Sequence, residues 1–175
     1  MAQQYFVLGI GGTGMRCIES LIHLCAMGMF DDTDIHLLAL DTDKDNGNFA
    51  RLKEVKEAYV KAKGTDASLR TALNETFFSA NINYYEFSPN YEVKSDFMSV
   101  FNYGDTKFNN PEQTAIADLV LTKNVETFNL RHGYRAQTHL GSMMMYHSIL
   151  EAARSNKNSE LKTYLQKLIQ VAQNG

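Results

Sequence analysis

The sequence predicts an α/β fold built on a mostly parallel β-sheet. Two short, nearly continuous apolar runs, 5–10 and 35–40, are typical of strands that are buried on both faces. A long apolar stretch at helical spacing, 13–29, separates them, so the three segments predict a right-handed βαβ unit. Because parallel sheets are covered by helices on both faces, we predict a three-layer, Rossmann-like fold.

The first predicted strand runs directly into a glycine-rich turn. Four of the six positions from 9 to 14 are glycine: Gly9, Gly11, Gly12 and Gly14. Their Gly-x-Gly-x-x-Gly spacing, between a predicted strand and a predicted helix, satisfies the dinucleotide-binding fingerprint. Glycine lets a phosphate approach the backbone, and the start of the following helix favours an anion. The alternative is that the glycines serve only the packing of the helix on the sheet.

The second predicted strand ends in a polar loop, Asp41 to Asn48. Ligands of open α/β sheets bind at the carboxyl ends of strands, and an acid at this point often holds a ribose hydroxyl. Asp41 lies 32 positions after Gly9, which is longer than the usual spacing of about 20. The alternative is a solvated loop with Asx-turns. Within the strand, His36 is interpreted as a core histidine whose hydrogen bonds are satisfied.

The remaining elements follow from periodicity and capping signals. The run Gly64-Thr65-Asp66 is expected to end one helix and to cap the next. Helices are predicted over 49–63, 66–78, 111–121, 123–130, 142–155 and 160–172, with a short strand over 83–87.

A second glycine-bearing polar loop spans 131–141 and precedes a predicted helix. It contains Gly133, Tyr134, Arg135 and Gly141. Arginine side chains beside helix N-terminal amides suit a phosphate. The alternative is that its arginines meet only carboxylates.

Composition excludes several classes of function. A chain of 175 residues is expected to form one domain, and a net charge of −3 disfavours nucleic acid as a partner. No apolar run approaches the ~20 residues of a membrane span, and the first residues lack a signal sequence. We therefore expect a cytoplasmic protein, with Cys17 and Cys25 as reduced thiols in the core.

No familiar catalytic or metal-binding pattern is present. The sequence has no nucleophile elbow, Walker lysine, CxxC or HExxH motif, so no catalytic residue is predicted. His132, His139 and His147 have no cysteine or carboxylate partner at metal-ligand spacing, so no metal site of the protein itself is predicted.

The glycine turn, the loop after the second strand and the loop before the helix at 142 resemble, in that order, loops of the tubulin/FtsZ family of GTPases. The chain is most similar to the N-terminal part of tubulin-like proteins of bacterial gene clusters, in which 46–48 and 133–135 have counterparts. The resemblance implies binding of GTP or GDP, with Mg²⁺ possible alongside the nucleotide, and self-association. The nucleotide-binding residues that we predict are Gly9, Gly11, Gly12, Thr13, Gly14, Met15, Arg16, Asp41, Thr42, Asp43, Asn46, Asn48, Gly133, Tyr134, Arg135 and Gly141.

The sequence departs from the family pattern at several points. Met15 or Arg16 stands where the family has a base-contacting Asn or Gln, and Asp41 stands where the division proteins have Asn. The glycine-rich signature loop after strand four and the later catalytic acid are absent. The resemblance therefore implies a truncated domain, residues 1–175, that holds half of a site and is inactive alone. Its first partner would be the remainder of its own polypeptide.

Three other interpretations stay open. The pattern Gly9-x-Gly11-Gly12-x-Gly14, Asp41-x-Asp43 and Asn48-x-x-Arg51 is similar to the ATP-dependent adenylation fold of ubiquitin-activating enzymes, although a second acidic motif and zinc cysteines are missing. The chain is also compatible with a generic Rossmann dinucleotide-binding domain, or with an interaction module that binds no nucleotide.

Overall fold

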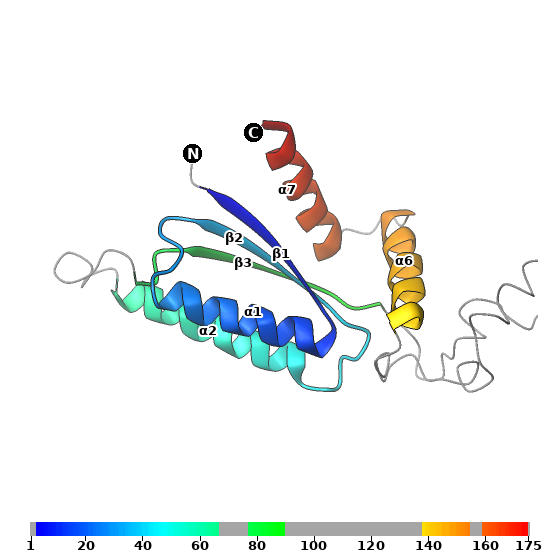
Figure 1. Ribbon diagram of the computed structural model, residues 1–175, viewed down its shortest axis with the longest axis horizontal. Coiled ribbons are helices and arrows are strands. Elements are labelled where there is room, and N and C mark those ends of the chain that lie inside the picture. The colour runs from blue at the N-terminus through cyan, green and yellow to red at the C-terminus, as the bar shows by residue number, and fades with distance from the viewer. Residues whose placement is uncertain (1–2, 67–76, 90–137, 155–158, 175) are drawn as a thin grey trace, which may run out of the picture.

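A computed structural model describes residues 3–66, 77–89, 138–154 and 159–174 and shows an α/β fold (Figure 1). In chain order the elements are β1 (Gln4–Ile10), α1 (Gly11–Ala26), β2 (Asp34–Leu40), α2 (Asn48–Asp66), β3 (Asn81–Phe87), α6 (Thr138–Arg154) and α7 (Glu160–Asn174).

The three strands of the described residues form one parallel sheet in the order β1-β2-β3. Gln4 pairs with Asp34, which pairs with Asn81, and at the other end Ile10 pairs with Leu40. The predicted parallel sheet is thus confirmed, and the third strand begins at Asn81 rather than at 83. Because the strands are parallel, the chain leaves β1 and β2 toward helices at the same edge of the sheet.

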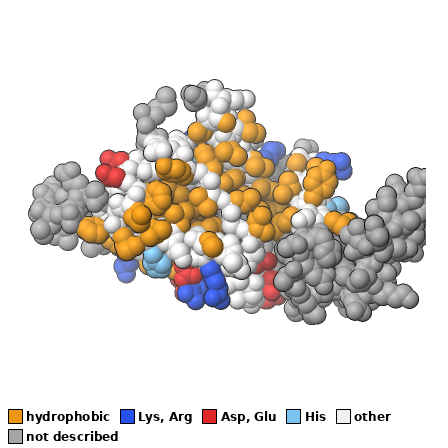
Figure 2. Space-filling model, in the orientation of Figure 1, with side chains coloured by type: hydrophobic (Ala, Val, Ile, Leu, Met, Phe, Trp, Pro, Cys, Tyr) orange, Lys and Arg blue, Asp and Glu red, His pale blue; other side chains and the backbone are white. Residues whose placement is uncertain are grey.

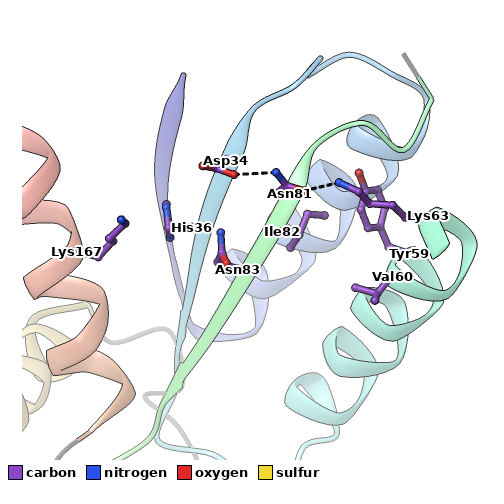
Figure 3. Close-up of a pocket in the computed structure, with 9 residues that line it drawn as sticks. All are labelled: Asp34, His36, Tyr59, Val60, Lys63, Asn81, Ile82, Asn83 and Lys167. Atoms are coloured by element: carbon purple, nitrogen blue, oxygen red, sulfur yellow. Dashed lines mark hydrogen bonds between the residues drawn. The ribbon is translucent and has the colours of Figure 1, made fainter. Parts of the chain in front are cut away.

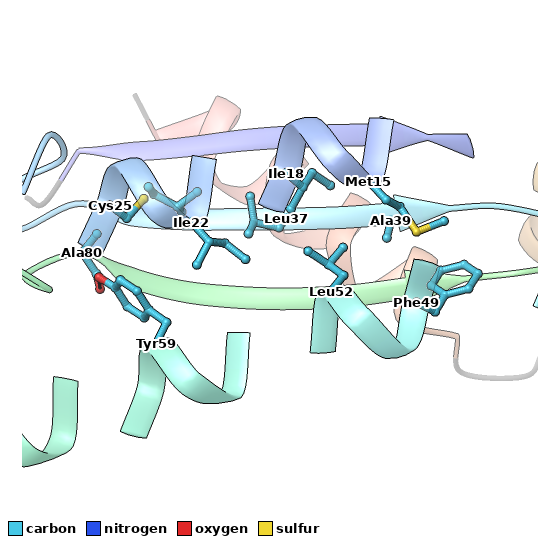
Figure 4. Packing of buried hydrophobic residues seen from close by; sticks show 11 residues of the cluster. Met15, Ile18, Ile22, Cys25, Leu37, Ala39, Phe49, Leu52, Tyr59 and Ala80 are labelled. Carbon is cyan, nitrogen blue, oxygen red and sulfur yellow. Dashed lines mark hydrogen bonds between the residues drawn. The ribbon is translucent and has the colours of Figure 1, made fainter. Parts of the chain in front are cut away.

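Helices cover both faces of this sheet. On one face α1 packs against β1 and β2, and α2 packs against β3. Figure 4 shows the side chains of this layer meeting over the sheet, among them Ile18, Leu37 and Leu52. On the other face α7 contacts β2 and β3, with Leu161 and Tyr164 in a separate core that Met145 of α6 joins. Each core contains apolar residues of alternate positions of β2, which is why that strand reads as a continuous apolar run.

Two predicted helix boundaries are wrong. The predicted break at Gly64 does not occur, because α2 continues to Asp66. Glycine costs only ~1 kcal/mol in a helix, so a single glycine near the end of α2 does not have to break it. At the other end of the chain, α6 begins at Thr138, so Gly141 lies inside a helix and not in a loop.

Several predictions fall on other parts of the chain. The predicted helices 111–121 and 123–130, and most of 66–78, lie outside the described residues. Among the described helices, none combines the length and the apolar character needed to cross a bilayer.

Burial of β1 differs from the prediction. In the described part of the chain β1 is an edge strand, and Leu8 and Ile10 are 49% and 53% exposed. Figure 2 shows hydrophobic side chains spread over the side of the molecule that carries β1 and α7. The two thiols also differ: Cys25 is buried, which raises its pKa to about 11, whereas Cys17 is exposed and not in the core.

Candidate functional site

Two glycines of the turn between β1 and α1 are required for packing. A Cβ added to Gly9 would lie 2.8 Å from the carbonyl oxygen of Gly14, and one added to Gly14 would lie 2.7 Å from the carbonyl carbon of Gly9. The strand and the helix therefore touch backbone to backbone, which no larger residue permits. For this pair the packing interpretation holds whether or not a ligand binds.

The other two glycines of the turn have different surroundings. Gly11 has φ +67°, in the left-handed region that favours glycine, and a Cβ there would meet nothing within 4 Å. It opens α1, and Ile10 at the N-cap offers no side-chain acceptor to the first turn. The backbone N–H groups at the start of α1 are thus available to an anion.

The loop after β2 begins with a buried carboxylate. Asp41 is 3% exposed. Its Oδ1 accepts a hydrogen bond from the backbone N–H of Asp43 at 3.1 Å, and its Oδ2 accepts one from the Asn46 amide at 3.3 Å. Loss of hydration raises the pKa of Asp41, and these two bonds oppose the rise. Neither ion pair found among the described residues involves Asp41.

Asx-turns continue through this loop, as the alternative interpretation expected. The backbone N–H of Asp45 donates to Asp43 Oδ1, and that of Asn48 donates to Asn46 Oδ1, each at 3.0 Å. The loop is nevertheless not simply solvated, because its first carboxylate is buried.

Asn46 and Asn48 connect this loop to the glycine turn. Asn46 binds both the Asp41 carboxylate and the N–H of Asn48 at the start of α2. The Asn48 side chain in turn lies against Gly12, where an added Cβ would be 2.7 Å from Asn48 Nδ2. A chain of contacts therefore joins the end of β2 to the starts of both α1 and α2.

Two hydroxyl groups at this edge have no hydrogen-bond partner in the described structure. Thr42 is 2% exposed and its Oγ1 is buried without a partner. Ser88 Oγ is also buried without a partner. The hydrogen bond from Asp41 N–H to the Phe87 carbonyl shows that Ser88 follows the end of β3, next to the end of β2. A buried unpaired hydroxyl costs about 1–3 kcal/mol. Sequence reasoning missed Ser88, although a polar residue directly after a predicted strand was a usable signal.

The remaining predicted residues are scattered. Met15 is 2% exposed and its side chain lies in the core, whereas Thr13 and Arg16 are exposed on α1. Gly141 is buried inside α6. Gly133, Tyr134 and Arg135 lie outside the described residues.

Arg51, which the adenylation interpretation required at the phosphates, is engaged elsewhere. Its Nε and Nη2 donate to Glu19 Oε1 at 2.9 and 2.7 Å, so it ties α2 to α1. Within the described ranges no three His, Cys, Asp or Glu side chains are grouped so that they could hold a metal ion.

The site thus consists of uncapped backbone donors at the start of α1, a buried carboxylate and unpaired hydroxyls at the ends of β2 and β3. In comparisons with known families, curated proteins and solved structures, the chain gives no significant match.

Proposed function

We propose that the carboxyl edge of the sheet binds a nucleotide, and that this chain is the N-terminal, GTP-type nucleotide-binding portion of a tubulin/FtsZ-like protein with a Rossmann-like fold. One observation carries the proposal. The uncapped start of α1 lies at the same edge of a parallel sheet as the buried Asp41 and the unpaired Thr42 hydroxyl. Open α/β sheets bind their ligands at this edge.

The residues present fit a nucleotide in two parts. The backbone N–H groups at Gly11 and Gly12 would hold phosphate oxygens, since Gly11 has open space around it. The Asp41 carboxylate would accept a hydrogen bond from a sugar hydroxyl. The Thr42 hydroxyl would donate to another sugar hydroxyl and would thereby gain the partner that it lacks. Mg²⁺ would enter with the phosphates, and Asp43 is the partly buried carboxylate beside them.

The preference for guanine rests on the family resemblance. Of the two residues that replace the base-contacting amide, Met15 is buried and Arg16 is exposed, so Arg16 is the side chain able to reach a ligand.

The alternatives are less well supported. Adenylation would need Arg51 at the phosphates, and Glu19 holds it. A module without a nucleotide explains Gly9 and Gly14 through packing but leaves the buried Thr42 hydroxyl without a partner. A dinucleotide would use the same glycine turn, and the titration below separates it from GTP.

Partners of the chain are also part of the proposal. We propose that the exposed apolar side chains of β1 are covered by the remainder of its own polypeptide or by self-association. Exposed apolar edge strands are templates for pairing. The free thiols of Cys17 and Cys25 suit a reducing, cytoplasmic location.

The test is a titration of the purified chain with a fluorescent guanine nucleotide, with GDP, ADP and NAD as competitors. We expect saturable binding that GDP competes away, and weaker binding in Asp41→Asn. Competition by ADP or NAD but not by GDP would replace the proposal with the adenylation or dinucleotide alternative. No saturable binding of any of the three would leave the interaction module.

A further inference from the structure

A pocket of about 540 Å³ opens at the amino edge of the sheet, opposite the candidate nucleotide edge. Figure 3 shows that it surrounds the start of β3. His36 and Lys167 lie on the α7 side of the sheet, and Tyr59 and Val60 of α2 lie on the other side. The pocket therefore offers a polar end and an apolar end, separated by an edge strand.

His36 is buried but its hydrogen bonds are not all satisfied, which corrects the sequence prediction. The ring is 4% exposed and stacks on Phe6, with ring centroids 4.6 Å apart. Tyr85 Oη lies 3.5 Å from Nδ1, whereas Nε2 is buried without a partner. If Tyr85 donates to Nδ1, the neutral ring carries its proton on Nε2. Nε2–H is then a buried donor that lacks an acceptor.

The charges around His36 are unequally compensated. Lys63 is fully engaged, since its ammonium donates to the Ser79 and Ala80 carbonyls and to Asn81 Oδ1. Asp34 accepts a hydrogen bond from the Asn81 amide at 3.0 Å. Lys167 has no hydrogen bond or ion pair within the described part of the chain. Among the charged groups that line the pocket, Lys167 is thus a cation without a counter-ion.

The backbone of β3 forms the outer rim of the pocket. The N–H of Asn81 bonds to the Thr33 carbonyl and therefore points toward β2. Because backbone groups alternate along a strand, the N–H of Ile82 points to the open side of β3. Ile82 also lines the pocket. The two side-chain groups without a partner, His36 Nε2–H and the Lys167 ammonium, are therefore donors, and the edge backbone at Ile82 forms the rim of the pocket.

We propose that this pocket binds the oxyanion group of a small acid, a phosphate or a carboxylate, through Lys167 Nζ and His36 Nε2–H. Charge-assisted hydrogen bonds to an oxyanion satisfy each of these groups. The site is separate from the nucleotide edge and does not depend on it.

The experiment is an NMR titration of the full chain, following the His36 imidazole and the backbone amides at constant ionic strength. Inorganic phosphate is one arm, acetate the second and sodium chloride the reference. We expect a saturable shift at His36 and Ile82, together with a rise in the pKa of His36, because a nearby anion favours the protonated ring. Loss of hydration and the Lys167 charge hold that pKa below its usual value in the free protein. The arm that gives the response identifies the group as phosphate or carboxylate.

Lys167→Gln should weaken this binding about tenfold, since it removes a charged hydrogen bond. The substitution alone also raises the pKa of His36, so the anion-induced change is measured within each variant. Lys162→Gln, on the same helix, is the matched control and should bind as the parent does. Phosphate that binds at the nucleotide edge would instead shift the amide resonances of Gly11 and Gly12, and it would do so in both variants. This response distinguishes binding at that edge from binding in the pocket. A His36 response that is absent with both anions, equal to that of chloride, or unchanged in Lys167→Gln would overturn the proposal.

Discussion

The two ends of β2 each bury a threonine, and the two threonines are treated differently. Thr33, at the amino end, is 4% exposed and its hydroxyl donates to the Asp31 carbonyl at 2.8 Å. Thr42, at the carboxyl end, is 2% exposed and its hydroxyl has no partner in the described structure. The first hydroxyl contributes to the fold, whereas the second costs stability. A buried polar group that a fold leaves unsatisfied needs a partner from outside the chain, either an ordered water or a ligand.

The largest expected effect concerns the glycines of the turn between β1 and α1. Gly14→Ala should destabilise the protein by about 3 kcal/mol, because the new Cβ overlaps the backbone of Gly9. Gly12→Ala is the control, since the added Cβ meets only the movable Asn48 side chain. Urea unfolding measures both. Equal stability of the two variants would contradict the division of the turn into packing and ligand-facing glycines.

The threonine pair tests the comparison directly. Thr33→Val should lower the free energy of unfolding by about 1 kcal/mol, since it removes a satisfied hydrogen bond. Thr42→Val should leave that free energy unchanged or raise it. The same substitution should weaken nucleotide binding about tenfold.

Both variants are measured by urea unfolding and by nucleotide titration. We expect Thr33→Val to be the less stable of the two and Thr42→Val to be the weaker nucleotide binder. If Thr33→Val weakened binding as much as Thr42→Val, the difference between the two ends of β2 would have no functional meaning.

Titration should also distinguish the ends of β2. Loss of hydration is the largest cause that lowers the pKa of His36. The positive charge of Lys167 lowers this pKa further, and the negative charge of Asp34 raises it. The folded protein therefore binds fewer protons at this ring than the unfolded chain does. The contribution of His36 to the free energy of unfolding is fully present above the unfolded pKa of about 6.5. It is lost as the pH drops through the lower pKa of the folded state. Urea midpoints from pH 7.5 to pH 5 should show this loss, and His36→Gln should lack it.

Asp41 should act in the opposite sense. Its pKa is raised by burial, so the folded state holds the proton more tightly than the unfolded chain. The contribution of Asp41 then favours the fold at low pH and diminishes as the pH rises through the folded pKa. Asp41→Asn should remove this dependence, which urea midpoints between pH 4 and pH 7 would reveal. An unaltered pH profile in that variant would mean that the carboxylate is not buried in solution.

The smallest effect on stability is expected on β1, which lacks an outer neighbour among the described strands. Ile10→Lys should change the free energy of unfolding by about 0.5 kcal/mol or less, because the side chain is exposed. It should reduce self-association in sedimentation experiments, since a lysine on an edge strand opposes pairing. Val60→Lys, an exposed apolar position on α2, is the control. Equal association of the two variants would remove β1 as the contact surface.

The amino-acid sequence by itself determined the order of the elements and the location of the candidate site. Strands at β1 and β2, the helix between them and the polar loop at Asp41 follow from periodicity and turn residues, which are local properties. The parallel sheet followed too, because a strand–helix–strand unit has one favoured hand and places both strand ends at one edge.

Only the tertiary structure decided what each residue does there. Gly9 and Gly14 became packing contacts because strand and helix backbones meet, while Gly12 faces a side chain of α2. Helix α2 continues through Gly64 to Asp66, and the Lys63 ammonium ties it to the turn before β3. Burial of Asp41 and the unpaired hydroxyl of Thr42 depend on neighbours distant in the sequence. Hydrogen-bond satisfaction and burial are sums over such neighbours, and a local pattern contains no information about them.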